Sequence, residues 1–358
     1  MDSAIKQRQQ EWDFVKAILI VFVVWGHVCS YISNATYERN LLTSVIRLYQ
    51  MPMFILVSGY FSKPSETLND VKRSFSKIGT GHLIPYVSWC IIGALIVFGM
   101  NEILLGKILG GIAYVIKTIA QESNILWFLG CLILCKGYYL IFSWFSVKIW
   151  RGFYVLSLLL VLFMPVDLWH FSFLYPFFIM GVVLRKVDLK RMIGPKWLIA
   201  WGVIALIMLI GSQFVPTSYT FYNASNYVFD NGIAGTGIQL GFIIARYVVY
   251  GLVTICYLML FLNIFEFRKA KPFVKKICNL GQETLGIFLV HIVLLYHVFR
   301  PFLSAATSNE GIFPETSFLR YYIVGSGIAV IALIISLMIT KLLERYKITR
   351  LVLLGKKV

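Results

Sequence analysis

The sequence predicts an all-α fold, a polytopic membrane helical bundle of about ten transmembrane helices with both termini cytoplasmic. Hydrophobic residues make up 59% of the 358-residue chain and charged residues only 14%, whereas soluble domains contain roughly a quarter charged residues. Apolar windows of about twenty residues, the length that crosses a bilayer, recur along the chain. Basic residues gather in alternate connections between these windows, which is typical of cytoplasmic loops.

The windows predict the spans of a single integral membrane domain, residues 1–358. They lie near residues 14–33, 45–62, 83–100, 126–145, 150–166, 170–185, 197–214, 240–264, 283–303 and 320–342. The stretch 103–121 is also apolar, but Lys107, Gly110-Gly111 and Lys117 interrupt it, and we interpret it as interfacial or re-entrant. The first window has no small-residue cleavage site after it, so we expect a retained helix rather than a signal peptide.

The charge pattern sets the expected topology. With the N-terminus inside, the inner connections and the C-terminal tail hold most of the basic residues, among them Lys63, Lys72, Arg73, Lys77, Lys148, Arg151, Arg185, Lys186, Lys190, Arg191, Lys196, Arg268, Lys269, Lys271, Lys275 and Lys276. The outer connections hold few basic residues and several acidic ones, as the positive-inside rule requires. The net charge of +17 therefore marks topology, and we expect no nucleic-acid partner.

The cysteines predict no metal or redox chemistry. The six cysteines are Cys29, Cys90, Cys131, Cys135, Cys256 and Cys278, and most of them lie inside predicted spans. Cys131 and Cys135 share a helical face, but small apolar packing is the favoured interpretation. The chain also has no P-loop, no Gly-x-Gly-x-x-Gly, no Gly-x-Ser-x-Gly elbow and no cluster with metal-ligand spacing, which are the usual signals of nucleotide, hydrolase or metal sites.

The first span carries the strongest indication of a site. Lys16 stands near its start and His27 lies deep inside it, eleven residues further on. This separation is close to three helical turns, so both side chains share one face about 16 Å apart along the axis. Ionisable groups at membrane depth are costly and usually functional. A histidine that only packs in the core is the alternative, and the lysine on the same face favours function.

A second histidine lies at comparable depth in another predicted span. His291 ends the segment Thr284-Leu285-Gly286-Ile287-Phe288-Leu289-Val290-His291, and His297 follows toward the outer end. Two histidines at similar depth indicate a shared cavity, and a histidine that only braces the bundle is the alternative. A neutral imidazole is the usual general base near neutral pH.

Charged and aromatic residues toward the outer face form a second group. Arg47 and Arg246 lie one to two turns inside their spans and should line a wet or anionic cavity, or pair with carboxylates such as Glu122 or Asp230. The outer loop 215–239 is rich in Tyr, Asn and Gly, with Tyr222 and Tyr227 as candidate platforms for sugar rings. A glycine-rich turn region explains the same composition equally well.

Two further segments are candidates for contributing to a binding site. Met51-Pro52-Met53-Phe54 and Ser58-Gly59-Tyr60 follow one another in the second span, where proline kinks a helix and Ser-Gly permits close packing. The inner loop places Lys72, Arg73 and Lys77 together at the membrane surface. Such a patch either attracts anionic lipid or binds phosphate.

These motifs resemble the family-3 membrane acyltransferases, in particular the fucose 4-O-acetylase-like branch that modifies surface polysaccharides. The family signature is a basic residue, ten intervening residues and a histidine in the first helix, matched here by Lys16 and His27. Further matches are Met51-Pro52-Met53-Phe54, Ser58-Gly59-Tyr60, Ile84-Pro85-Tyr86, Trp127-Phe128-Leu129, Tyr175-Pro176-Phe177-Phe178 and the segment that ends at His291. The chain departs from the family in having Lys16 where many members have Arg, and in the insertion Gly79-Thr80-Gly81-His82.

The resemblance implies an inner-membrane O-acetyltransferase that moves an acetyl group from cytoplasmic acetyl-CoA to a sugar hydroxyl of a polysaccharide or lipid-linked glycan. Expected roles are catalytic for His27 and His291, donor binding for Lys16, Ser58, Tyr60, Lys72, Arg73 and Lys77, and acceptor binding for Asp13, Arg47, Glu122, Trp127 and Arg246. Membrane lipids are expected partners, and no metal is expected. A flippase for a lipid-linked glycan, a membrane scaffold, and transfer of another short acyl group such as succinyl are the alternatives.

Overall fold

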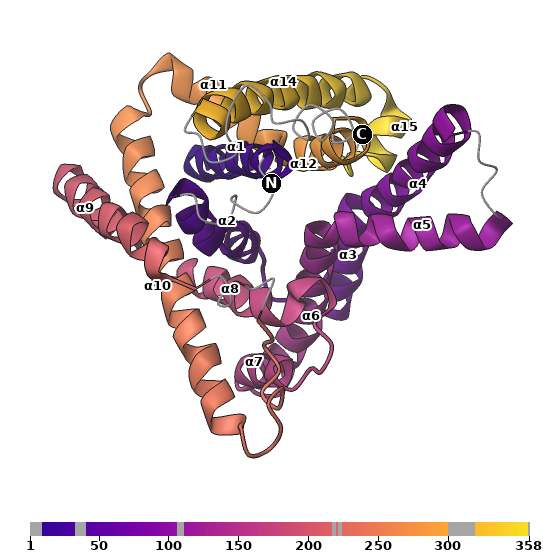
Figure 1. Ribbon diagram of the computed structural model, residues 1–358. Helices are drawn as coiled ribbons and strands as arrows, with labels where there is room; N and C mark the ends of the chain where they lie inside the picture. The colour runs from indigo at the N-terminus through magenta and orange to yellow at the C-terminus, as the bar shows by residue number, and fades with distance from the viewer. Residues whose placement is uncertain are drawn as a thin grey trace, which may run out of the picture.

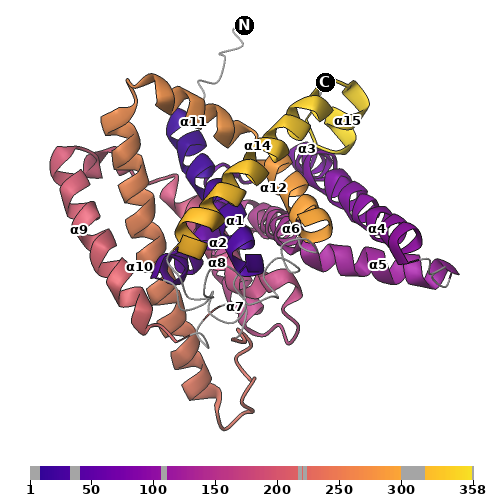
Figure 2. The same cartoon turned by 45° about the horizontal axis from the view of Figure 1, so that its top comes forward.

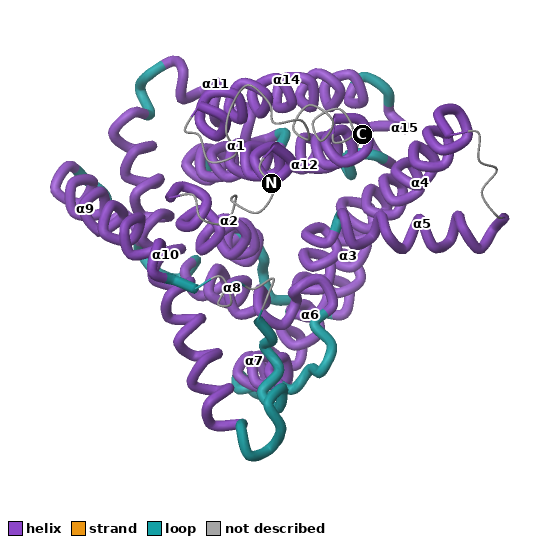
Figure 3. Tube along the Cα trace, viewed as in Figure 1, coloured by secondary structure: helices purple, strands orange, loops and turns teal. Residues whose placement is uncertain are grey.

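The computed structural model describes residues 9–32, 41–105, 111–216, 220, 224–299 and 319–356, and within these residues it is helical with no strand (Figure 3). Tyr222 lies outside the described residues. The helices are α1 Gln10–Ile32, α2 Leu41–Tyr60, α3 Leu68–Ile78, α4 Ile84–Leu105, α5 Gly111–Ile125, α6 Trp127–Lys148, α7 Phe153–Leu162, α8 Phe171–Leu184, α9 Pro195–Gly211, α10 Thr236–Arg268, α11 Pro272–Gln282, α12 Thr284–Val293, α14 Gly325–Glu344 and α15 Lys347–Val352. Three π-helical segments adjoin them: η2 Gly79–Leu83, η7 Leu294–Phe299 and η8 Leu319–Val324.

The predicted membrane bundle is confirmed as a class. Within the described ranges, seven helical stretches are long and apolar enough to cross a bilayer, or eight if the bent pair Pro272–Gln282 and Thr284–Phe299 forms one span. Each of the ten predicted windows contains a helix, but α7 and α8 are shorter than a full span. The ten residues of α7 extend about 15 Å, half of a hydrocarbon core of about 30 Å. Ten complete spans therefore stay a prediction.

α1 lies at the centre of the bundle. It packs against α2, α10, α11, α12 and α14, with α11, α12 and α14 on one side of it and α2 on the other (Figure 1). α4 and α5 form a separate arm, so the stretch interpreted as interfacial or re-entrant contains a helix that packs along α4.

Glycine brings α2 and α8 into backbone contact. A Cβ atom at Gly59 would lie 1.9 Å from the carbonyl oxygen of Phe178, and one at Gly181 would lie 1.9 Å from that of Leu56. The absence of a side chain at both positions permits this approach, which is how small residues pack membrane helices. α8 is thereby fixed against α2, the helix that carries Ser58.

An ion-pair network joins α12, α14 and the C-terminal segment at one end of the bundle. The carboxylate of Glu283, 6% exposed, accepts hydrogen bonds from Lys341 at 2.5 Å and from Lys356. Both lysines also contact Glu344. Glu283 stands between α11 and α12, which are bent by 65°. The top of Figure 2 shows that α3, α11 and α15 all lie at this end. The network therefore holds the bend that adjoins the candidate site.

Candidate active site

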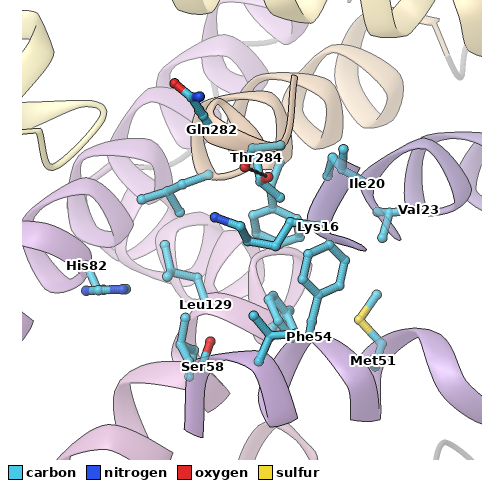
Figure 4. A pocket seen from close by; sticks show the side chains of 16 residues that line it. Lys16, Ile20, Val23, Met51, Phe54, Ser58, His82, Leu129, Gln282 and Thr284 are labelled. Atoms are coloured by element: carbon cyan, nitrogen blue, oxygen red, sulfur yellow. Dashed lines mark hydrogen bonds between the residues drawn. The ribbon is translucent and has the colours of Figure 1, made fainter. Parts of the chain in front are cut away.

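A cavity of about 230 Å³ opens between α1, α2, α6 and α12 (Figure 4). Its lining comprises Lys16, Ile20, Val23, Met51, Phe54, Val57, Ser58, His82, Phe128, Leu129, Leu132, Gly281, Gln282, Thr284, Leu285 and Phe288. The polar groups are unevenly distributed: the amine of Lys16 and the ring of His82 lie on one side in Figure 4, whereas Val23 and Met51 lie on the other. We call the polar side at Lys16 and His82 the mouth, and the apolar side at Val23 and Met51 the deep end.

The mouth is built from segments far apart in the sequence. Lys16 forms an ion pair with Asp13 at 2.7 Å, one turn earlier on α1. His82 comes from the π-helical segment η2, which follows α3, and its Nε2 lies 3.1 Å from the Nζ of Lys136 on α6. Gln282 comes from the last turn of α11, next to Glu283 and its network. Two lysines, a histidine and an amide therefore meet at one entrance.

The bend between α11 and α12 places Gln282 and Thr284 at this entrance. The Thr284 hydroxyl donates to the carbonyl oxygen of Gly281 at 2.6 Å, and so satisfies a backbone group that the interrupted helix leaves free. Gly281 itself packs against α1, because a Cβ there would lie 1.8 Å from the Asp13 carbonyl oxygen. The same contact holds the start of α1 and the bend together.

Three phenylalanines contribute to the lining of the cavity. Phe54 from α2, Phe128 from α6 and Phe288 from α12 are 8%, 9% and 7% exposed. The ring centroids of Phe54 and Phe128 are 5.7 Å apart, and those of Phe128 and Phe288 are 5.5 Å apart. Such distances are typical of attractive aromatic pairs, so the rings form one continuous wall.

The two predicted catalytic histidines lie close together, next to Phe288. The ring centroids of His27 and His291 are 5.5 Å apart, and the Phe288 ring lies 5.8 Å from that of His291. His291 is fully buried, whereas His27 is partly exposed. The Nδ1 atom of His291 lies 2.8 Å from the carbonyl oxygen of Ile287. Because a carbonyl only accepts, Nδ1 carries the proton, and in a neutral ring Nε2 is the acceptor.

One face of α1 connects the mouth to the histidine pair. Lys16, Ile20 and Val23 line the cavity at helical spacing, and His27 follows Val23 by one further turn on the same face. This arrangement is the one that the spacing of Lys16 and His27 predicts. A long ligand that enters at Lys16 would extend along this face toward His27.

Comparison with known proteins identifies the family. The model of a family described as an acyltransferase domain matches residues 9–339. The chain belongs to acyltransferase family 3. The family membership expected from the motifs is therefore confirmed.

Two curated relatives match a short part of this acyltransferase. The nodulation protein NolL of Sinorhizobium fredii is 29% identical over 91 residues, and the NolL of Mesorhizobium japonicum is 25% identical over 91 residues. The aligned segment covers 25% of this chain, and 25% and 24% of the two relatives. The match thus spans about a quarter of their length. No solved structure matches the chain.

Not all of the other residues expected to bind the donor line the cavity. Ser58 lines the cavity. Tyr60, two residues later, packs on the Trp12 ring with centroids 4.1 Å apart. Lys72, Arg73 and Lys77 are exposed on α3, and the capping box between Thr67 and Asp70 fixes the start of that helix. These three cations therefore lie on the helix before His82 rather than in the cavity wall.

The residues assigned to the acceptor do not line the cavity. Arg246 is fully buried, donates to the carbonyl oxygen of Ser225 at 3.1 Å and lies over the Phe173 ring. The Trp127 ring contacts that of His170, and Arg47 is half-buried two turns into α2.

Asp13 and Glu122, the two carboxylates expected to bind the acceptor, each form an ion pair. Asp13 lies at the mouth beside Lys16. Glu122, which the sequence suggested as a partner of Arg47 or Arg246, contacts the Nε2 atom of His297 at 2.9 Å, and both side chains are buried. His297 lies in η7, which continues α12 beyond His291. The pair joins the α4–α5 arm to the helix that carries the catalytic candidate.

Sequence reasoning missed Lys136 and Gln282. A signal for Lys136 was available, because it is a lone lysine within the predicted span 126–145 and such residues are usually functional. Gln282 gave no signal, since an amide in a basic inner connection is unremarkable. Its place at the cavity depends on the bend at Glu283, which the hydropathy pattern does not reveal.

Proposed function

We propose that this acyltransferase transfers an acetyl group from acetyl-CoA to a sugar hydroxyl of a surface glycan or its lipid-linked precursor, in the bacterial inner membrane. The observation that carries the proposal is the α1 face that lines the cavity at Lys16, Ile20 and Val23 and continues to His27, beside His291. A polar mouth and an apolar interior suit a donor with anionic phosphates at one end and an uncharged thioester at the other. Family membership supports acyl transfer.

The donor phosphates are assigned to the mouth. Lys16 and the pair of Lys136 with His82 supply positive charge and N–H donors there, and charge-assisted hydrogen bonds to phosphate are among the strongest in proteins. Lys72, Arg73 and Lys77 on α3 raise the local positive potential and attract the donor before it binds. The pantetheine arm then occupies the apolar part of the cavity.

The proton transfer is assigned to His27. The acceptor oxygen attacks the thioester carbonyl carbon, His27 takes the hydroxyl proton, and the bond between that carbon and sulfur breaks. The CoA thiolate leaves and receives the proton from His27, so an ester and free CoA result. General-base assistance of this kind typically contributes 10²–10⁴-fold.

His291 is assigned a positioning role in this step. It is fully buried and its Nδ1 atom is held by the Ile287 carbonyl, so its ring orientation is fixed. A fixed second imidazole 5.5 Å from that of His27 restricts where the base can lie. An acyl-histidine intermediate would use the same pair.

Labelled acetyl-CoA, supplied to the purified protein in lipid nanodiscs with glycan fractions from the source membrane, tests the proposal. Label should appear in the glycan as an alkali-labile ester, and release of free CoA should match it mole for mole. Binding and translocation of glycan without incorporated label would instead identify a flippase. Transfer from succinyl-CoA but not from acetyl-CoA would correct the donor and retain the reaction.

A further inference from the structure

The phenylalanine wall, formed by Phe54, Phe128 and Phe288, lines the cavity, and its Phe288 ring contacts the ring of His291. Each ring comes from a different helix, each lines the cavity, and Phe128 contacts both of the others. The centroids of the Phe288 and His291 rings are 5.8 Å apart. The wall therefore bounds the part of the cavity that adjoins His291.

Helical spacing places the cavity lining close to both histidines. Phe288 precedes His291 by three residues and Val23 precedes His27 by four, which corresponds to about 5–6 Å of helix axis. In the proposed reaction the thioester carbonyl must come within reach of His27. The acyl chain is the terminal part of the donor, so it is the part that packs against the wall.

The wall has little room to adjust. The three side chains are more than nine-tenths buried and belong to the main hydrophobic core, and Phe128 contacts both of the other rings. Additional methylene groups in a well-packed interior force off-rotamer side chains and backbone shifts. An acyl chain longer than a few carbons would have to displace rings held from three helices.

We propose that Phe54, Phe128 and Phe288 determine the acyl-chain specificity of the enzyme and restrict it to short-chain acyl donors. The inference rests on the proposed function, because it assigns the acyl end of the donor to the deep end of the cavity. Removal of one ring creates space where the chain ends. The variants should therefore gain activity with longer donors relative to acetyl-CoA.

Measurement of kcat/KM with acetyl-, propionyl-, butyryl- and hexanoyl-CoA tests this assignment in Phe54→Ala, Phe128→Ala and Phe288→Ala. One methylene group in a hydrophobic pocket typically changes kcat/KM by about 10–200-fold. The kcat/KM of the wild type should be at least about tenfold lower with butyryl-CoA than with acetyl-CoA. Each variant should raise the ratio of kcat/KM with butyryl-CoA to kcat/KM with acetyl-CoA by about tenfold relative to the wild type. Phe128→Leu supplies a milder change if an alanine variant does not fold.

Phe265→Ala is the matched control. Phe265 is 7% exposed and pairs with the Phe14 ring at 5.7 Å in a separate core cluster, so its loss should leave the donor ratio unchanged. Folded variants at all three wall positions that keep the wild-type ratio would overturn the specificity role while acetyl transfer by the wild type persists. A wild-type protein that transfers no acyl group from any donor would overturn the proposed function itself.

Discussion

The two histidines beyond the cavity are held in different ways, and this difference separates their roles. His291 is fully buried, with Nδ1 bound to a helix carbonyl. His27 retains exposed surface and stands on the helix face that lines the cavity. An accessible imidazole is the one that can meet a substrate hydroxyl, whereas an enclosed one can only orient or polarise its neighbour.

At the mouth, Lys16→Gln should raise the KM for acetyl-CoA with little effect on the KM for the glycan. A hydrogen bond to a charged group contributes about 1.5–3 kcal/mol, which corresponds to roughly 10–100-fold in KM. Steady-state kinetics with each substrate varied in turn measure the effect. The control Lys269→Gln alters an exposed lysine that pairs with Glu266, so it should behave as the wild type. An unchanged donor KM in Lys16→Gln would remove the phosphate role.

Residue spacing predicted part of the site and long-range packing supplied the rest. Lys16 and His27 share a face because helical periodicity alone determines it, and His291 joined them because both histidines stand at similar depth. Lys136 reaches His82 only through the packing of α6, and Gln282 lines the cavity only through the bend before α12. No local pattern encodes which helices become neighbours, so these contacts could not be predicted from one sequence.

Among the elements, α2 and α8 depend on the glycine contact between them. Gly59→Ala and Gly181→Ala should each lower the free energy of unfolding by about 1–3 kcal/mol, because the added Cβ meets backbone atoms that cannot rotate away. Thermal unfolding in detergent measures the loss. Gly202→Ala on α9 is the control, since a Cβ there meets nothing within 4 Å. Equal stability of all three variants would show that the close approach does not hold these helices.

The bend between α11 and α12 depends on Glu283. Glu283→Gln should lower stability by about 1 kcal/mol, a small value because Lys341 and Lys356 are 53% and 31% exposed and water screens both pairs. It should also raise the donor KM, since Gln282 and Thr284 flank the bend and line the cavity. Glu266→Gln, which breaks the exposed pair with Lys269, should change neither quantity. A normal donor KM in Glu283→Gln would show that the ion-pair network does not position the residues that line the cavity.

Hydropathy predicts where the long apolar helices lie but not all of the helix boundaries. The windows located the long apolar helices because burial in lipid requires long apolar stretches. They did not predict that α7 covers only Phe153–Leu162, or that α11 forms a separate amphipathic helix against α1. These features arise from tertiary contacts such as the one between Gly281 and Asp13, which leave no periodic trace.

For the whole molecule, the positive-inside rule predicts that α11 faces the cytoplasm and the turn at Asp230 faces the opposite side. Lys275→Cys and Asp230→Cys test this arrangement, because both positions are exposed and the six native cysteines are buried. A membrane-impermeant maleimide should label Asp230→Cys in intact spheroplasts and Lys275→Cys only in inverted vesicles. The reverse pattern would place the mouth of the cavity on the outer face, away from cytoplasmic acetyl-CoA.

In the proposed mechanism the cavity holds the donor and His27 acts as the general base. The most direct measurement compares acetyl transfer and CoA binding in His27→Asn and the wild type, with both proteins folded in nanodiscs. Transfer should fall by about 10²–10⁴-fold, while the Kd for CoA stays within about twofold, because the phosphates bind about 16 Å away at Lys16. Near-normal transfer by folded His27→Asn would contradict the claim.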